Sequence, residues 1–152
     1  MFTVVLLEPQ IPPNTGSIAR LCGAASVKLD IVGELGFDLS DKQMLRAGLD
    51  YWQYIEWEYH PNLNDYYEKL IQKTDFHLFT TKANVRYTQR KFSKNDSLVF
   101  GSETTGISED FLRSQWDRAC TIPIMNKHIR SLNLATSVGI VLYEALRQIN
   151  GK

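Results

Sequence analysis

Short apolar runs alternate regularly with longer amphipathic segments along this chain. The apolar runs are rich in β-branched and aliphatic residues, as buried strands are, and they span residues 3–7, 28–35, 53–59, 76–81, 97–101 and 119–124. The amphipathic segments predict helices over residues 14–25, 40–50, 62–73 and 108–116, and a last helix that ends near residue 148. Strands that alternate with helices are joined by crossovers, so the sequence predicts an α/β fold with a mostly parallel sheet and helices on both faces.

Polar residues at the starts of these segments predict the helix N-caps. Asn14 precedes the first run of helix formers, and either Ser40 or Asp41 precedes the second. Ser131 and Asn133 are both candidates for the cap of the last helix.

Length and composition predict one domain, residues 1–152. A chain of 152 residues, 43% hydrophobic and 22% charged, fits one globular unit with one core. The opening MFTVVLLEPQ has no basic segment before its apolar run, which favours a first strand over a signal peptide. No stretch approaches the roughly 20 apolar residues of a membrane span. We therefore expect a cytoplasmic protein without a membrane partner.

The cysteines and histidines do not indicate a disulfide framework or a metal site. Cys22 and Cys120 lie far apart and form no CxxC pair, so we expect both to be small buried residues. His60, His77 and His128 lack the spacing of metal ligands, and we expect no metal.

The formal net charge is zero, but the two halves of the chain differ in sign. Residues 1–75 hold six basic and eleven acidic side chains, whereas residues 76–152 hold eleven basic and six acidic ones. Zero net charge argues against strong non-specific binding to nucleic acid.

The basic residues are densest in KANVRYTQRKFSK, residues 82–94, which contains no acid. Basic side chains neutralise phosphates and aromatic rings stack on exposed bases, so this composition favours an RNA-facing loop. A solvated basic loop fits the composition as well. The RNA-binding candidates are Arg86, Arg90 and Lys91, with Tyr87 and Phe92 interleaved.

Polar and glycine-rich residues cluster in three loops that follow predicted strands: EPQIPPNTGSIAR, GSETTGIS and MNKHIRSLN. In an open parallel sheet, ligands bind at the carboxyl ends of the strands. The second loop resembles a phosphate-binding loop, but it has Ile107 where that loop needs lysine, and Glu103 brings a negative charge. A nucleoside triphosphate hydrolase is therefore a minor alternative. Gly101 and Gly106 fit either a backbone that approaches a neutral or cationic ligand closely or a turn with positive φ.

Together, EPQIPPNTGSIARLC, LVFGSETTGIS and IPIMNKHIRSLNLATSVGIVLYEA resemble the three signature motifs of the SpoU branch of SPOUT methyltransferases. The chain is most similar to small tRNA ribose 2′-O-methyltransferases that modify the wobble nucleotide, cytidine-34 or a modified uridine-34. SDKQMLRAGLDY strengthens the resemblance, which covers nearly the whole chain. It implies an enzyme that uses S-adenosylmethionine, a deep C-terminal trefoil knot, a tRNA partner and a homodimer.

The resemblance also assigns site residues by position. Cofactor contacts would fall on Phe79, Gly101, Ile122, Met125, Ser131 and Leu132. The catalytic motif residues would be Arg20, Asn14, Glu103, Ser131, Asn133 and Tyr143, with Glu8 a lesser candidate. Removing a proton from a guanidinium at pH 7 costs about 7 kcal/mol, so we expect Arg20 to orient the substrate and stabilise charge on oxygen rather than act as a base.

The chain departs from the resembled pattern in the second motif and in the third-motif loop. Ser102 and Thr105 stand where close relatives often have proline and arginine, and the third loop is one residue longer. We hypothesise that Lys127 or Arg130 replaces the arginine lost at position 105, as a contact to RNA.

The last helix has two faces. Its apolar stripe comprises Leu134, Val138, Val141, Leu142, Ala145 and Ile149. Ala135 and Gly139 make a second, smooth patch that fits either intramolecular packing or a second copy of the chain. The alternative to an enzyme is a non-catalytic RNA-binding protein of the same fold, and the intact Arg20, Glu103, Ser131 and Asn133 favour the enzyme.

Overall fold

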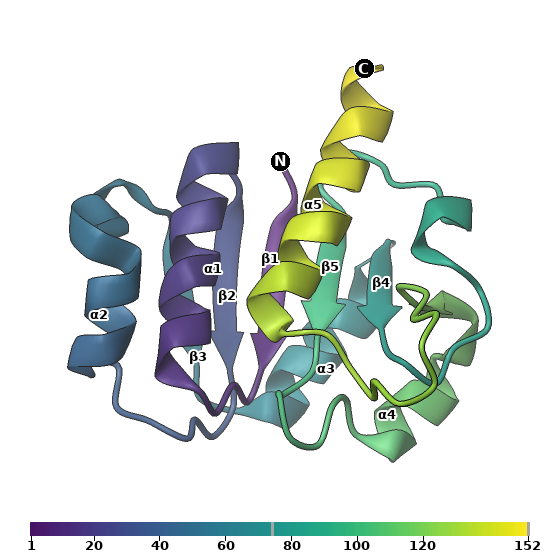
Figure 1. Cartoon of the computed structure of the whole chain (residues 1–152), viewed down its shortest axis with the longest axis horizontal. Coiled ribbons are helices and arrows are strands. Elements are labelled where there is room, and N and C mark those ends of the chain that lie inside the picture. Colours follow the sequence, from purple (N-terminus) through teal and green to yellow (C-terminus); the bar gives the residue numbers. More distant parts are fainter. Residues whose placement is uncertain (74, 152) are drawn as a thin grey trace.

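A six-stranded, entirely parallel sheet organises the chain, with the strand order β3-β2-β1-β5-β4-β6 (Figure 1). The computed structural model describes residues 1–73 and 75–151. The strands are β1 (Thr3–Leu7), β2 (Lys28–Val32), β3 (Trp57–His60), β4 (Phe76–Phe79), β5 (Ser97–Phe100) and β6 (Ala119–Cys120). The predicted α/β fold with a parallel sheet is confirmed.

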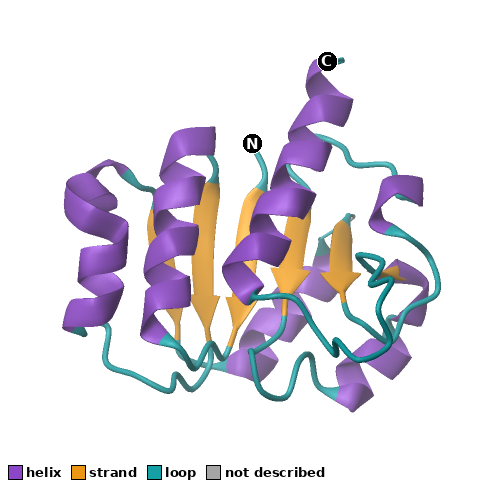
Figure 2. Cartoon of the chain, in the orientation of Figure 1, coloured by secondary structure: helices purple, strands orange, loops and turns teal. Residues whose placement is uncertain are grey.

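Helices cover both faces of the sheet (Figure 2). The helices are α1 (Pro12–Ala25), α2 (Lys42–Gly48), α3 (Leu63–Gln72), α4 (Glu109–Ser114) and α5 (Leu134–Asn150), with 3-10 turns at η1 (Leu49–Tyr54), η2 (Tyr87–Gln89) and η3 (Trp116–Arg118). Helices α1, α2 and α5 lie in front of the sheet in Figure 1, and α3 and α4 lie behind it. Within the described chain, no helix has the length and apolar character of a membrane span.

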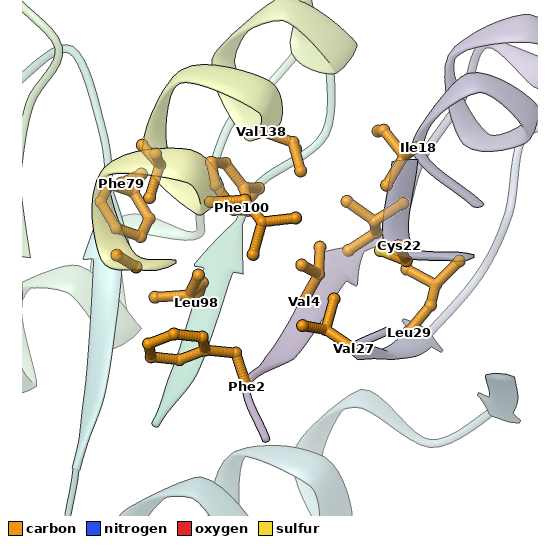
Figure 3. Close-up of a cluster of buried hydrophobic side chains, with 14 of the residues drawn as sticks. Phe2, Val4, Ile18, Cys22, Val27, Leu29, Phe79, Leu98, Phe100 and Val138 are labelled. Carbon is orange, nitrogen blue, oxygen red and sulfur yellow. The ribbon is translucent and has the colours of Figure 1, made fainter. Parts of the chain in front are cut away.

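The core has two layers because successive side chains of a strand point to opposite faces. Val4 and Leu6 of β1 pack in the cluster under α1 and α5, whereas Val5 and Leu7 pack in the cluster under α3 and α4. Figure 3 shows the first layer, in which strand residues such as Leu98 meet α1 and α5.

Both cysteines are buried and free, as expected. Burial raises the pKa of each thiol to about 12, so neither Cys22 nor Cys120 is a reactive thiolate. The predicted apolar stripe of α5 also belongs to the core, since Val138, Val141 and Leu142 are fully buried.

The prediction that Asn14 is the N-cap of α1 is wrong. Ile11 is the N-cap, and Pro12 and Pro13 occupy the first helical turn, where a missing N–H costs no hydrogen bond. Asn14 is therefore inside the helix and buried, and its amide is free to bond elsewhere. For α2, the Asp41 carboxylate accepts the Gln43 N–H at 2.8 Å, which selects Asp41 over Ser40.

Only the strand predicted over residues 3–7 has the expected bounds, and the other five strands are shorter than predicted. Two of these five differ most from the prediction. The run 53–59 forms a strand only over Trp57–His60, because the chain before it makes the 3-10 turn η1. The run 119–124 forms a strand only over Ala119–Cys120, with Thr121 in an isolated parallel bridge to Arg86. The residues beyond Thr121 form a loop over the carboxyl ends of the strands.

Candidate active site

A cavity of about 570 Å³ lies at the carboxyl ends of β1, β4, β5 and β6. The strand order reverses between β1 and β5, which is where ligands bind in open α/β sheets. Four segments line the cavity: the start of α1, residues 79–82, residues 100–107 and the loop that leads into α5. Its volume falls in the range of about 300–1,000 Å³ that small-molecule sites occupy.

A chain of hydrogen bonds joins three of these segments. The Glu103 carboxylate accepts the N–H groups of Gln10 and Ile11 at 2.8 and 2.9 Å. It also accepts the Asn14 side-chain amide at 3.2 Å, and the Asn14 oxygen accepts the Asn133 amide at 3.0 Å. Glu103 therefore ties the loop after β5 to the loop after β1, across the switch in strand order.

The two glycines of the second loop are needed for different structural reasons. Gly106 has a φ of +69°, so it supplies the turn that an L side chain disfavours. A Cβ atom on Gly101 would fall well under 3.0 Å from the backbone of Gly106 and Ile107. Gly101 is thus required for the close approach of two backbone segments that form the cavity wall.

The sequence profile of the SpoU rRNA methylase family matches residues 1–143. The chain belongs to the SpoU family. A tRNA (cytidine(34)-2′-O)-methyltransferase of Methylovorus glucosotrophus (strain SIP3-4) is 43% identical over 150 residues, which cover 97% of this chain and 96% of that protein.

Solved structures share the same SpoU fold. One, described as giving structural insights into the 2-OH methylation of C/U34 on tRNA, has a TM-score of 0.93 and 35% identity, and the match covers 100% of this chain and 98% of that chain. An S-adenosylmethionine-bound rRNA methyltransferase from Sinorhizobium meliloti has a TM-score of 0.85 and 26% identity, covering 97% of this chain and 56% of that one. The family predicted from the three motifs is confirmed.

Most of the cofactor residues carried over from the SpoU motifs lie at the cavity. The lining includes Phe79, Gly101, Ile122, Ser131 and Leu132. Phe79 is also a core residue, with its ring stacked on Phe100 at 4.8 Å. Met125 is the exception, because it is 80% exposed and outside the lining.

The six catalytic candidates of the SpoU motifs divide into two groups. Asn14, Glu103, Ser131 and Asn133 line the cavity, whereas Arg20 and Tyr143 do not. Arg20 is six residues beyond Asn14, about 9 Å along the helix and on another face, so it points away from the cavity of its own chain. Its guanidinium lies 5.4 Å from the Tyr51 ring centroid. Tyr143 is 51% exposed.

Asn133, rather than Ser131, caps α5. The Asn133 side-chain oxygen accepts the Thr136 N–H at 3.1 Å, while its amide nitrogen bonds Asn14. One side chain therefore fixes both the helix start and the cavity wall. Ser131 is exposed and is one of the residues that line the cavity.

The predicted RNA-facing residues occupy several environments. Arg130 lines the cavity, whereas Lys127, Arg86 and Lys91 are exposed outside it. Arg90 is partly buried and holds the fold, since it donates to the His77 ring at 3.3 Å and to the Asp117 carbonyl at 2.8 Å.

The predicted stacking role of Phe92 is wrong. Phe92 is 6% exposed and packs against His77 and Phe79, because its loop folds back over the sheet. Tyr87 is half-buried and also packs on the core. The composition of the loop resembled a stacking surface, but its aromatic rings anchor the loop to the protein.

Sequence reasoning missed several cavity residues. Thr80 follows the end of β4, Ile124 lies in the loop after β6 and Ser137 lies in the first turn of α5, and all three line the cavity. Lys82 lines it as well, although the sequence showed it only as one member of a basic run. Ile107 is buried in the α3 and α4 cluster, so the second loop is not a phosphate cradle.

The buried His77 predicts a pH dependence of stability. Its Nδ1 accepts a hydrogen bond from Arg90, and its Nε2 bonds Asp96 at 2.8 Å. Desolvation lowers the pKa of His77 below the ordinary 6.5, against the opposing effect of Asp96. Below pH 6.5 the unfolded chain binds the proton more readily, so the free energy of unfolding should fall as the pH decreases from 6.5 to the folded-state pKa.

Urea denaturation of the wild type and of His77→Gln between about pH 7.5 and pH 5 would measure this contribution. Glutamine can still donate to Asp96 but does not titrate. The variant should lose part of the decrease in stability, and an identical pH slope in both proteins would contradict the assignment.

Proposed function

We propose that this SpoU protein is an S-adenosylmethionine-dependent tRNA ribose 2′-O-methyltransferase that acts on the wobble nucleotide, cytidine-34 or a modified uridine-34. The observation that carries the proposal is that one cavity at the carboxyl edge of the sheet brings the three motif loops together. The names of the relatives with the same length and fold support the choice of substrate.

The cavity fits S-adenosylmethionine in size and chemistry. The described residues that line it include one acid, Glu103, and two bases, Lys82 and Arg130, which suits a ligand that carries both a carboxylate and positive charges. Phe79, Ile122 and Leu132 supply apolar walls, and the close backbones at Gly101 supply polar N–H and C=O groups for an adenine. When bound, this cofactor supplies the methyl group as the electrophile.

The residues around the cavity would bind and orient the ribose. Asn14 and Asn133 are held by each other and by Glu103, so their positions are fixed before the substrate arrives. The Ser131 hydroxyl, at the cavity wall, would contact the cofactor or the ribose. Arg20 would hold a substrate phosphate and stabilise negative charge on the 2′-oxygen.

Replacing Arg20 tests whether this residue orients the substrate without contributing to cofactor binding. Because Arg20 lies outside the cavity of its chain, Arg20→Ala should lower the rate of methyl transfer about 100-fold and change the Kd for S-adenosylmethionine less than about twofold. Initial rates on tRNA and equilibrium dialysis measure the two quantities. Arg113→Ala, at an exposed arginine of α4, is the control. Equal rates in both variants would exclude the role of Arg20.

We also propose a homodimer in which α1 and α5 face a second copy. Arg20 would then reach the cavity of the partner chain, and the exposed Tyr143 would lie at the contact. The Ala135 and Gly139 patch contributes less than its pattern suggested, because a Cβ on Gly139 would lie 3.7 Å from Leu21 of its own α1. Light scattering should give twice the mass of one chain, and a monomer with full activity would exclude this arrangement.

We further propose that the C-terminal segment forms the trefoil knot of the resembled family and that the protein acts in the cytoplasm as a single domain. The pairing of Thr121 supports the knot, because its N–H donates to the Val85 carbonyl and its carbonyl accepts the Tyr87 N–H, both at 2.8 Å. In this proposal, the residues after Thr121 would pass through the loop that joins β4 and β5 before they reach α5.

Transfer of a labelled methyl group tests the proposed function. The protein, labelled S-adenosylmethionine and bulk tRNA should yield radioactive, alkali-resistant dinucleotides, which report ribose 2′-O-methylation. A protein that binds tRNA but transfers no label would support the alternative, a non-catalytic RNA-binding protein of the same fold. The intact Asn133, Asn14 and Glu103 network favours the enzyme.

A further inference from the structure

A second cavity, of about 330 Å³, lies beside the first one. It is lined by Leu7, Glu8, Tyr67, Lys82 and residues 105–109. The two cavities share four wall residues, Lys82, Thr105, Gly106 and Ile107. The two cavities are therefore adjacent, with Lys82 and the 105–107 segment bordering both.

Glu8 occupies a strained and closely supported position in this second cavity. Its φ is +51°, an unfavourable conformation for a residue with a side chain, and such conformations cluster at active sites and ligand-binding segments. The backbone is held on both sides, since its N–H donates to the Val32 carbonyl at 2.7 Å and its carbonyl accepts the Gln10 side chain at 2.8 Å. A Cβ on Gly33 would lie 2.6 Å from the Glu8 Cγ, so only glycine there admits this side chain.

The two oxygens of the Glu8 carboxylate differ in their environment. Oε2 accepts the Glu34 N–H at 3.0 Å, which fixes the orientation of the group. Oε1 accepts no hydrogen bond from the part of the chain that the structure describes. A fixed carboxylate with one free oxygen in a cavity is an acceptor prepared for a donor on a ligand.

The other side chains of the cavity suit a flat ring on a charged backbone. Tyr67 is held in place by parallel stacking on Phe111, with ring centroids 3.9 Å apart. Lys82 pairs with the exposed Glu109 at 3.3 Å and borders both cavities, where it could approach a phosphate.

We propose that the second cavity receives the pyrimidine base of the target nucleotide and that the free Glu8 oxygen accepts a hydrogen bond from the exocyclic amino group of cytosine. This inference rests on the proposed function, which brings the ribose of that nucleotide to the first cavity. Bases in single-stranded RNA loops expose their Watson–Crick edges, and a carboxylate pairs with the cytosine amino group but not with the uracil O4, which is an acceptor.

The Glu8→Gln variant tests the inference, because it should reverse the preference between cytidine and uridine. The glutamine oxygen would keep the bond from the Glu34 N–H, which places the NH₂ group where Oε1 was. The free acceptor becomes a donor, which suits the uracil O4 and not the cytosine amino group. We expect wild-type kcat/KM to favour an anticodon stem-loop RNA with cytidine-34 over one with uridine-34 by about tenfold, and Glu8→Gln to reverse the preference.

Two further variants serve as controls for the change in the cytidine-to-uridine ratio. Glu34→Gln removes the same charge from an exposed neighbour and should leave the cytidine-to-uridine ratio unchanged. Glu8→Asp withdraws the carboxylate and should bring the ratio near one without reversing it. Wild-type and Glu8→Gln proteins with the same ratio would overturn the inference while the proposed function stands. A wild-type protein that methylates neither RNA would overturn the proposed function, and this inference with it.

Discussion

Gly101→Ala should abolish measurable binding of S-adenosylmethionine. The added Cβ would overlap the backbone of Gly106 and Ile107, and backbone atoms cannot move aside as a flexible side chain can. The loop after β5 must open to accept it, which separates the walls of the cavity that Gly101 and Ile107 both line. Equilibrium dialysis with labelled cofactor should show a Kd at least about 100-fold weaker, because misplacement of a site by about 1 Å has effects of that size.

Gly106→Ala is the matched control for this prediction. Its Cβ would meet nothing within 4 Å, so only the positive φ opposes it, at a cost of about 1–2 kcal/mol. This variant should fold and bind the cofactor with a modest loss, and circular dichroism should show native secondary structure in both proteins. Equal affinities in the two variants would show that the close approach at Gly101 does not build the site.

Glu103→Ala should lower the rate of methyl transfer by about 1,000-fold. The carboxylate accepts three hydrogen bonds, from Gln10, Ile11 and Asn14, and bonds to a charged group contribute about 1.5–3 kcal/mol each. Without it, the loop after β1 loses its tie to the loop after β5. Asn14 then loses its fixed position at the cavity. Initial rates at saturating tRNA and cofactor would measure the loss.

Glu103→Gln tests whether charge and acceptor number both matter. One glutamine oxygen can accept an N–H, but its NH₂ group would face a second donor, so the rate should stay closer to Glu103→Ala than to the wild type. Asp110→Ala, which removes an exposed carboxylate of α4 outside the lining of both cavities, controls for the loss of a negative charge. A Glu103→Ala protein with more than about a tenth of wild-type activity would contradict the role of this network.

The parallel sheet and the three loops of the cavity could be predicted from the sequence for a simple physical reason. Buried strands such as 3–7 and 97–101 read as continuous apolar runs, and the carboxyl ends of parallel strands lie at one edge. Polar loops that follow such runs must therefore meet, and the Glu103 and Asn14 bond is the result.

The errors came from residues whose role depends on contacts far apart in the sequence. Asn14 has the composition of an N-cap, but two prolines moved the helix start ahead of it and left its amide to bond Glu103. Phe92 belongs to a basic loop, and only the return of that loop onto His77 and Phe79 shows that its ring is buried. The distance of Arg20 from the cavity follows from helix geometry, but the sequence alone did not place the cavity.

Calorimetric titration of the folded wild-type protein with S-adenosylmethionine tests most directly whether the three loops form a cofactor site. We expect saturable heat with one molecule bound per chain and a Kd between about 1 µM and 1 mM, the equivalent of about −8 to −4 kcal/mol. A control methyltransferase should show binding under the same conditions. If the folded protein then gives no heat with this cofactor, the three loops do not form a cofactor site.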